Sequence, residues 1–533
     1  MIKTALILDR ESITAWQLNA LVDAAALIDI RVVLSCNNAK QKRFLGRNLL
    51  YYVLNAFSLR NRQTVRLRYE NSKGRFVHFD AIDDGVWQKL PAEVVDELAK
   101  EGVKLVIKFG MGLLRIEGAL VDMNILSYHH GDPSEFRGRP AGFYEILLGK
   151  DSVGTIVQTI TNKLDAGRIW AVCHSKVSFH SYKQTSLRFY ENSRHLLKKA
   201  IVNLANGTPV DLHPSGPVYK LPSNALVLRF ALLLGIRKVS RLFYGAFWEK
   251  RWNIAVFDRE TVIFDAPLRP AQGQVPSVAA GYSFYADPFF SGNGVDIRVE
   301  ALSSATGYGE IISLARQTLQ PIEVLLRGAH YSYPFSWVED GVEYLVPEIA
   351  SHSAPMLLRR EGRDLVPLPI KGLEKLRILD GTIFKHQDHY YLLGGSTQAA
   401  EDCLDLYVSP SLLGEFRPHP GNPVVIDPKR GRMAGRVVRL GDSLVRFGQD
   451  NTRQYGDGVT VCEIIKLSPT EYEERVLRKI RFDGVSGPHT VDVVPGGAVL
   501  DFYVDRFSLL AWYRRLAPRV LKRLRSKGPV RSR

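Results

Sequence analysis

The sequence predicts two fold classes in one chain: an α/β domain with an open, mostly parallel sheet, followed by an all-β five-bladed propeller. Two observations support this prediction. In the first 210 residues, apolar runs of strand length alternate with segments of helix-like spacing, which is typical of a parallel sheet. After Trp252 the long helical periodicity disappears, and short strand-like runs recur between glycine, proline and aspartate residues, as in all-β domains.

The first 35 residues predict a β-α-β unit. Apolar runs of strand length occupy residues 3–9 and 28–35, and residues 13–27 between them place apolar side chains at helical spacing. This order predicts parallel pairing through a right-handed crossover. The alternation continues with a basic helix-prone insertion, a strand, a helix and a strand, at residues 40–61, 76–79, 91–101 and 103–109.

Composition divides the chain into four segments. The α/β domain takes residues 1–210 and the five-bladed propeller takes residues 251–506. Between them, residues 211–250 combine a proline- and glycine-rich linker with a basic amphipathic helix. Residues 507–533 form a basic amphipathic tail.

The formal net charge of +16 suits phosphate-rich ligands, an anionic membrane surface or nucleic acid. Much of this charge lies in the tail after Leu509, which suits peripheral contact with a membrane, packing on the propeller, or a solvated tail. The segment from Ala225 to Trp248 is apolar but interrupted by four cations, so an interfacial or packed helix is favoured over a membrane span. The sequence contains no nucleic-acid motif, so we expect no nucleic-acid partner.

The four cysteines are scattered, without a C-x-x-C pair, which argues against a disulfide scaffold and against a zinc site. No stretch reaches the roughly 18 uninterrupted apolar residues of a spanning helix. We therefore expect no metal and a cytoplasmic protein, with peripheral contact at the inner membrane face as an option.

A histidine and a carboxylate follow two predicted strands of the α/β domain. His129 comes directly after the apolar run from Ile125 to Tyr128, and Asp165 lies in a tight Asp-Ala-Gly turn. Acyl transfer to an amine must stabilise an oxyanion and remove a proton from the amine. A histidine suits either task because its ordinary pKa lies near neutrality, and a carboxylate beside it can orient it.

The order of these motifs resembles the catalytic core of the folate-dependent formyltransferases, which include methionyl-tRNA and sugar-nucleotide formyltransferases. Arg137-Gly138 follows His129 as the Arg-Gly does in that family, and Leu164-Asp165-Ala166-Gly167 aligns with its Asp-x-Gly turn. Gly154-Thr155-Ile156-Val157 resembles the Gly-x-Thr strand, and the stretch from Lys108 to Leu114 resembles the loop that lines the folate pocket.

The resemblance implies a Rossmann-like fold and 10-formyltetrahydrofolate as formyl donor. It implies catalytic roles for three residues, His129, Asp165 and Ser127. It implies folate contacts for four residues, Gly110, Gly112, Leu113 and Asp165.

The chain departs from the family pattern beside the histidine. Ser127 stands where the family has asparagine, and losing one oxyanion donor typically lowers the rate about 10²–10³-fold. His130 and Asn124 are the nearby residues that could compensate. Gly131-Asp132-Pro133-Ser134 replaces the Ser-Leu-Leu-Pro of the family.

Short signatures recur in the all-β region at intervals of roughly 45–70 residues, which suits the four-stranded blades of a propeller. The region resembles arabinanase- and levanase-type propellers, and more closely the N-terminal propeller of glucosamine inositol phosphorylceramide transferases. The resemblance lies in three motifs: Tyr285-Ala286-Asp287-Pro288, Tyr333-Pro334-Phe335 with Val346-Pro347-Glu348, and Asp380-Gly381-Thr382.

Acidic residues of these motifs suit a central funnel, where carboxylates from several blades flank a glycosidic bond. The candidates are Asp287, Glu348, Asp380 and Asp450. Alternatively, aspartates in Asp-Pro and Asp-Gly pairs cap turns through their own backbone. Three histidines could line the same funnel, His330, His419 and His489.

Taken together, the sequence predicts an enzyme that transfers a formyl group to an amino sugar on a nucleotide, lipid or glycan carrier. The acceptor would be a small molecule or glycan with a free amine, held by the propeller. One alternative is a glycan-binding or glycan-hydrolysing propeller protein with a degenerate formyltransferase domain. Another is a non-catalytic scaffold for envelope-polysaccharide assembly.

Overall fold

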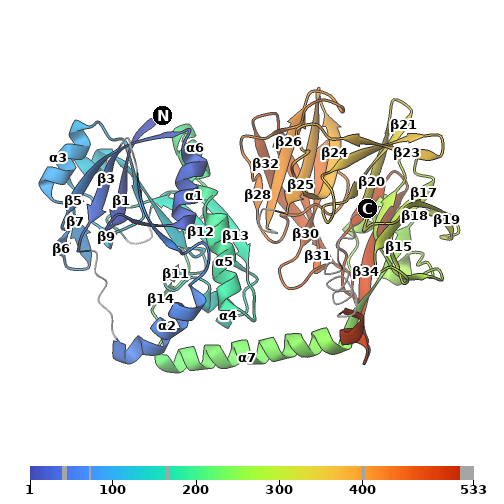
Figure 1. Ribbon diagram of the computed structural model, residues 1–533, viewed down its shortest axis with the longest axis horizontal. Helices are drawn as coiled ribbons and strands as arrows, with labels where there is room; N and C mark the ends of the chain where they lie inside the picture. Colours follow the sequence, from blue (N-terminus) through green and yellow to red (C-terminus); the bar gives the residue numbers. More distant parts are fainter. Residues whose placement is uncertain (39–44, 71–73, 164–166, 398–401, 516–533) are drawn as a thin grey trace, which may run out of the picture. The chain divides into compact units, whose positions relative to one another are not determined.

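A computed structural model of the protein describes residues 1–38, 45–70, 74–163, 167–397 and 402–515 (Figure 1). The chain divides into two compact units, an N-terminal unit, Met1–Lys238, and a C-terminal unit, Val239–Arg533. Among the described residues, no helix is long and apolar enough to cross a membrane.

A mixed sheet forms the centre of the N-terminal unit. Its described strands are β1 Ile2–Asp9, β2 Ser12–Thr14, β3 Ile28–Cys36, β4 Arg66–Arg68, β5 Arg75–Phe79, β8 Leu105–Lys108, β10 Asn124–His130, β12 Ser152–Thr159 and β13 Ile169–Lys176. The strands β5, β3, β1, β8 and β10 pair in parallel in that order. β12 and β13 continue the sheet beyond β10 as antiparallel strands, and β2 and β4 extend it antiparallel from the end of β1.

The sheet is therefore less parallel than the sequence predicts. Parallel neighbours need a crossover of about a dozen residues or more, which α1 (Ala15–Ala24) provides between β1 and β3. Only residues 160–168 connect β12 to β13, and so short a connection suits antiparallel neighbours.

Helices cover the sheet because they bury apolar faces against it. The remaining helices of the described N-terminal residues are α2 Leu45–Ser58, α3 Ala92–Lys100, η1 Gly118–Asp122, α4 Phe143–Leu147, α5 Tyr182–Ser193 and α6 Leu196–Asn206; α7, Asn224–Phe247, leads into the C-terminal unit. α5 and α6 pack on β13, and α1 packs on α6. α3 contributes Val94 and Leu98 to a core that includes Ala5 and Ile7 of β1.

Two smaller sheets complete this unit. β6 Ile82–Asp84, β7 Trp87–Lys89 and β9 Leu113–Leu114 form one, and β11 Arg137–Gly138 pairs with β14 Val218–Tyr219.

Antiparallel sheets make up the C-terminal unit. The first two described sheets contain β16 Tyr282–Phe290, β17 Asp296–Ser303, β18 Gly309–Ala315 and β19 Pro321–Leu326, then β20 Ser332–Glu339, β21 Val342–Glu348, β22 Met356–Glu361 and β23 Asp364–Pro369. The next two contain β24 Ile378–His386, β25 His389–Ser396, β26 Cys403–Ser409, β27 Arg417–Pro418 and β28 Val425–Ile426, then β29 Val438–Leu440, β30 Ser443–Asp450, β31 Gly458–Leu467 and β32 Tyr472–Ile480.

The fifth described sheet joins the two ends of the unit. It consists of β15 Trp248–Phe257, β33 Val491–Val494 and β34 Gly497–Phe507. β15 pairs antiparallel with β34 along its whole length, from Trp248 opposite Phe507 to Phe257 opposite Ala498 (Figure 1). Two short 3-10 helices follow β15, η2 Glu260–Phe264 and η3 Pro270–Gln272.

Candidate functional site

Arg432 of the C-terminal unit lies between two carboxylates that come from different sheets. Its Nη2 lies 3.2 Å from Glu348 Oε2 and 3.3 Å from Asp380 Oδ1, and its Nε also donates to Asp380. Gln449, in β30, donates a further hydrogen bond to Asp380 at 2.9 Å. Glu348 is the last residue of β21 and Asp380 lies near the start of β24, so strand ends from three sheets meet at this point.

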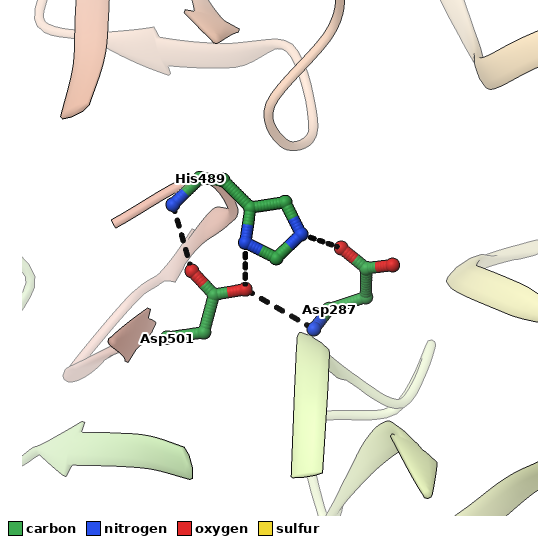
Figure 2. A group of neighbouring side chains, drawn as sticks. All are labelled: Asp287, His489 and Asp501. Atoms are coloured by element: carbon green, nitrogen blue, oxygen red, sulfur yellow. Dashed lines mark hydrogen bonds and ion pairs between the residues drawn. The ribbon is translucent and has the colours of Figure 1, made fainter. Parts of the chain in front are cut away.

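Beside this group, His489 is held between two buried aspartates (Figure 2). Its Nε2 lies 2.9 Å from Asp287 Oδ1, and its Nδ1 lies 2.7 Å from Asp501 Oδ2. The other oxygen of Asp501 accepts the backbone amides of His489 and Thr490 at 2.8 and 2.9 Å. The Thr490 hydroxyl donates to Asp287 at 2.6 Å. These contacts fix the ring and both carboxylates in one arrangement.

The charges in this group decide its protonation. Burial alone would lower the pKa of His489, but the charges of Asp501 and Asp287 raise it to about 10, so the ring is an imidazolium at neutral pH. Burial alone would raise the pKa of Asp287, but the charge and hydrogen bond of His489 hold it below its usual value. Asp287 is therefore an ionised carboxylate.

Two glutamates near the same group are held in the opposite state. Burial, with the charge of Asp380, raises the pKa of Glu348 well above its usual value despite the opposing charge of Arg432. Burial and the charge of Asp287 do the same for Glu300, a nearly buried residue of β17. The described residues thus place ionised and protonated carboxyl groups within electrostatic reach of one another.

Local backbone conformation aims the aspartates at this point. Asp287, Tyr333 and Asp380 have left-handed φ angles of 49°, 47° and 51°, a conformation that is uncommon for residues other than glycine and that clusters at functional sites. The Tyr333 amide, at the start of β20, donates to Asp287 Oδ2 at 3.2 Å. The Asp287 and Asp380 side chains therefore accept hydrogen bonds from residues of other sheets. The alternative that they only cap their own turns does not account for these bonds.

Asp287, His489 and Asp501 could each offer a ligand atom to a metal ion, since these atoms lie within 4.8 Å of one another. A metal-bound histidine must be neutral at the ligating nitrogen. Both ring nitrogens of His489 instead lie at hydrogen-bond distance from carboxylate oxygens, and its pKa is about 10. The present arrangement is that of a buried ion pair, so we assign it no metal.

Three other residues that the sequence suggested for the funnel have partners of their own. Asp450 pairs with Lys479 and accepts the Thr452 hydroxyl at 2.6 Å, while its neighbour Gln449 donates to Asp380. His330 accepts the Gly309 amide at 2.9 Å and is within electrostatic reach of Asp287. His419 accepts the Gly421 amide at 3.1 Å, inside its own turn.

Sequence reasoning missed four residues of the cluster, Glu300, Arg432, Gln449 and Asp501. Gln449 lies in Gly448-Gln449-Asp450, one of the recurring signatures, but Asp450 was the residue chosen from it; Glu300, Arg432 and Asp501 belong to no repeated motif. These residues can be recognised only in the folded structure, where they contact or lie near the buried carboxylates Asp287, Glu348 and Asp380.

In the N-terminal unit, the strand β10 separates the residues that the sequence grouped around His129. Successive side chains of a strand point to opposite faces, so Ser127 and His129 share one face while Asn124 and His130 lie on the other. Neither Asn124 nor His130 can therefore take the place of the family asparagine. His129 Nε2 lies 3.5 Å from the Phe136 carbonyl oxygen.

Among the described residues, no carboxylate lies at ion-pair distance from His129. Asp132, four residues before Phe136, instead lies 3.3 Å from His174 and accepts the Ser134 hydroxyl at 2.6 Å. Asp165 lies outside the described residues.

His130 is enclosed by aromatic rings. The ring centroids of Trp16, Phe189 and Tyr190 lie 5.3, 5.3 and 5.0 Å from its own, and its Nε2 lies 3.0 Å from the Ser193 hydroxyl. Burial lowers its pKa to about 3, so it is neutral and serves packing.

The glycines expected to line the folate pocket are packed against the chain itself. A Cβ on Gly110 would lie 2.5 Å from the Leu8 carbonyl carbon, and a Cβ on Gly112 would lie 2.9 Å from Gln88 Oε1. The Gly112 amide donates to that same oxygen, and Leu113 is partly exposed in β9. Internal packing is thus a sufficient reason for Gly110, which faces backbone atoms, whereas at Gly112 the contact is with the end of the flexible Gln88 side chain.

Comparison with known proteins places the strongest similarity in the C-terminal unit. Residues 272–483 match the family described as glucosamine inositolphosphorylceramide transferase 1, N-terminal. The protein named glucosamine inositolphosphorylceramide transferase 1 from Arabidopsis thaliana is 32% identical over 206 residues, which cover 36% of this chain and 27% of that protein. The protein of the same name from Oryza sativa subsp. japonica is 29% identical over 221 residues, 38% of this chain and 29% of that protein. The chain thus spans less than a third of the length of these curated relatives.

Solved structures resemble each unit only weakly. Glycinamide ribonucleotide transformylase 1 from Symbiobacterium toebii is 17% identical and covers 42% of this chain and 94% of its own, with a TM-score of 0.28. A thermostable family-43 glycoside hydrolase is 13% identical and covers 38% of this chain and 77% of its own, with a TM-score of 0.30. Likenesses of this extent carry no argument about function.

The prediction that the protein is a formyltransferase is wrong. The matched family and the curated relatives are named as glucosamine inositolphosphorylceramide transferases, and the match lies in the region that the sequence treated as a holder for the acceptor. The strand-end motif around His129 specifies a local arrangement of the backbone, and one fold can host many activities, so the motif alone does not establish the reaction. Binding of 10-formyltetrahydrofolate stays an untested prediction.

Proposed function

We propose that the C-terminal unit is a five-bladed propeller that binds a glycan at the Arg432–His489 cluster and acts on its glycosidic bond. The cluster consists of Asp287, Glu300, Glu348, Asp380, Arg432, Gln449, His489 and Asp501. The five described antiparallel sheets would be the blades, with the β15–β34 pairing closing the ring. The names of the relatives, which contain a glucosamine group and an inositol phosphate, support a glycosylated inositol phosphate as the substrate class.

The observation that carries the proposal is the separation of protonation states among neighbouring carboxyl groups. Cleaving or forming a glycosidic bond requires an acid that protonates the leaving oxygen and a carboxylate that acts on the opposite side of the reacting carbon. The raised pKa of Glu348 and the lowered pKa of Asp287 meet these two needs. Arg432, whose side chain is not fully buried, would hold Glu348 and Asp380 in place beside the sugar.

In this scheme Glu348 gives its proton to the glycosidic oxygen as the bond from that oxygen to the sugar carbon breaks. Asp287 accepts the proton of the attacking hydroxyl as the new carbon–oxygen bond forms. The hydroxyl belongs to water in hydrolysis and to an acceptor in transfer, so both outcomes use the same residues.

The test measures binding and turnover of glycosylated inositol phosphates by the full chain, with products identified by mass. General acid–base catalysis typically contributes about 10²–10⁴-fold, so Glu348→Gln should lower kcat at least about 100-fold and leave binding nearly unchanged. Glu463→Gln is the matched control, because Glu463 pairs with Arg475 outside the cluster, and it should retain wild-type turnover.

Full activity of Glu348→Gln would overturn the assignment of the acid. Binding without turnover by the wild-type protein would limit the unit to glycan recognition and overturn the bond-breaking step. Absence of both binding and turnover would overturn the proposal as a whole.

A further inference from the structure

The C-terminal unit exposes a group of large apolar side chains where the end of α7 adjoins residues 507–515. We call this group the apolar neck. It consists of Val239, Leu242, Phe243, Leu509, Leu510, Trp512 and Tyr513, each about half or more exposed. Monomeric soluble proteins rarely expose so many large apolar residues together, and such patches mark interaction surfaces.

The apolar neck is a fixed surface, because its two segments are tied together. The Phe507 ring lies 6.1 Å from the Phe247 ring and 5.3 Å from the Trp248 ring. The Ser508 amide donates to the Phe247 carbonyl at 2.7 Å, and Arg515 donates to the Trp248 carbonyl. The exposed residues that follow Ser508 are thereby held beside the end of α7.

Further exposed apolar residues of α7 lie on the same face of the helix as Val239 and Leu242. Leu228, Leu232 and Ile236 are exposed, and they precede Val239 and Leu242 at intervals of three and four residues, which lie on one face of a helix. Arg229 and Lys238 fall on the two flanks of this face and are also exposed. An apolar face bordered by cations is typical of a helix that lies in a membrane interface.

The two segments that form the apolar neck, α7 and the residues after Phe507, carry only positive charge. Residues 225–248 and 508–515 contain no aspartate or glutamate, and together they carry six arginines and lysines, Arg229, Arg237, Lys238, Arg241, Arg514 and Arg515. The nearest acidic residues in sequence are already engaged, Glu249 with Arg514 and Asp505 with Tyr244. A second copy of this surface would bring cations against cations, whereas an anionic lipid surface complements them.

We propose that the apolar neck docks the protein on an anionic phospholipid bilayer. Leu242, Phe243 and Leu509 would enter the boundary between headgroups and acyl chains. Trp512 and Tyr513 would lie at headgroup level, where amphipathic aromatic rings are enriched. The exposed cations of α7, Arg229 and Lys238, would face lipid phosphates, each contributing to binding that weakens with added salt.

The test is flotation of the full chain with vesicles of phosphatidylcholine, with and without phosphatidylglycerol. The wild-type protein should float with the anionic vesicles at low salt, and at least about tenfold less should float with phosphatidylcholine alone. The double variant Leu242→Gln/Leu509→Gln should bind at least about tenfold more weakly, because two apolar side chains lose their burial in the bilayer.

The matched control is Val295→Gln/Ile322→Gln, which alters two equally exposed apolar residues of the same unit outside the apolar neck. It should bind vesicles like the wild-type protein. Since all four positions are exposed, circular dichroism should show the same fold for both variants.

Three results would overturn the proposal. The first is failure of the wild-type protein to float with anionic vesicles at low salt, and the second is equal flotation of the double variant. The third is a dimer in sedimentation velocity that the double variant abolishes, with no vesicle binding by the wild-type protein, which would make the apolar neck an interface between copies.

Discussion

Two histidines, one in each unit, have their pKa values shifted in opposite directions: His130 is partly buried and His489 is buried. His130 has a pKa of about 3 and His489 a pKa of about 10, although burial lowers the pKa of both. Aromatic rings and the Ser193 hydroxyl surround His130, whereas two carboxylates lie against the ring nitrogens of His489. The comparison teaches that burial disfavours the protonated ring of both histidines, and that neighbouring carboxylates decide whether the ring is protonated nonetheless.

The same comparison explains which unit carries the proposed chemistry. The His129–His130 stretch has the more specific sequence motif, yet its described surroundings supply little charge. The C-terminal motifs are short, yet they bring buried carboxylates, an arginine and an imidazolium together. Clusters of shifted pKa values in one place are a feature of functional sites.

The largest effect on stability should come from removing His489, the cation between Asp287 and Asp501. His489→Gln leaves Asp287 and Asp501 buried without their partner, which should lower the free energy of unfolding of the C-terminal unit by about 3–5 kcal/mol. Hydrogen exchange in β33 and β34 at neutral pH measures this loss within the full chain. An effect below about 1 kcal/mol would mean that the ion pairs contribute nothing.

The wild-type protein should show the matching pH dependence. The folded pKa of His489, about 10, lies above its ordinary value of 6.5. The stability it contributes is therefore fully present below pH 6.5 and is lost as the pH rises through about 10. Protection of β34 should fall over this window, and His489→Gln should remove that dependence.

Much of the fold could be predicted from local pattern. The expected strand at 76–79 is β5, the helix at 91–101 is α3, and the strand at 103–109 is β8, each within a few residues. Apolar periodicity specifies such elements because each one buries a single face. The antiparallel β12–β13 pair was missed, because direction depends on which strands become neighbours, and apolar pattern alone does not encode that.

The sequence predicted four residues of the candidate site, Asp287, Glu348, Asp380 and His489, and the two aspartates were marked most clearly. Asp287 and Asp380 stand out in sequence because Asp-Pro and Asp-Gly pairs indicate unusual backbone conformations, and both residues have left-handed φ angles. Arg432 and Asp501 carry no such mark, and their roles arise from residues 52 and 214 positions away, Asp380 and Asp287. Long-range pairing of this kind cannot be read from spacing along one chain.

A smaller change should follow when one aspartate is neutralised and the histidine is kept. Asp501→Asn removes the carboxylate whose charge does most to raise the pKa of His489, so that pKa should fall below about 10, toward 6.5. Hydrogen bonds to charged groups contribute about 1.5–3 kcal/mol, which sets the expected loss of stability. NMR titration of the His489 ring measures the pKa, and an unchanged value would assign the shift to Asp287 alone.

The smallest effect on stability should come from replacing His130, the neutral histidine of the pair. His130→Phe keeps an aromatic ring among Trp16, Phe189 and Tyr190 and removes one hydrogen bond to Ser193, so the loss of stability should be about 1 kcal/mol. Ser193 retains its bond to the Phe189 carbonyl at 2.6 Å and is not left without a partner.

The pH dependence of this variant tests the comparison in the opposite direction. The folded pKa of His130, about 3, lies below its ordinary value of 6.5. Above pH 6.5 the ring is neutral in both the folded and the unfolded state, so it adds no pH dependence to stability there. As the pH falls from 6.5 toward 3, the unfolded state binds the proton first, and the N-terminal unit loses stability progressively. His130→Phe should remove this acid-side loss, as seen by hydrogen exchange in β10 between pH 6.5 and 4, and should leave the alkaline loss in β34 unchanged. An acid-side loss that persists in the variant would show that His130 is not its source, and the contrast between the two histidines would then rest on His489 alone.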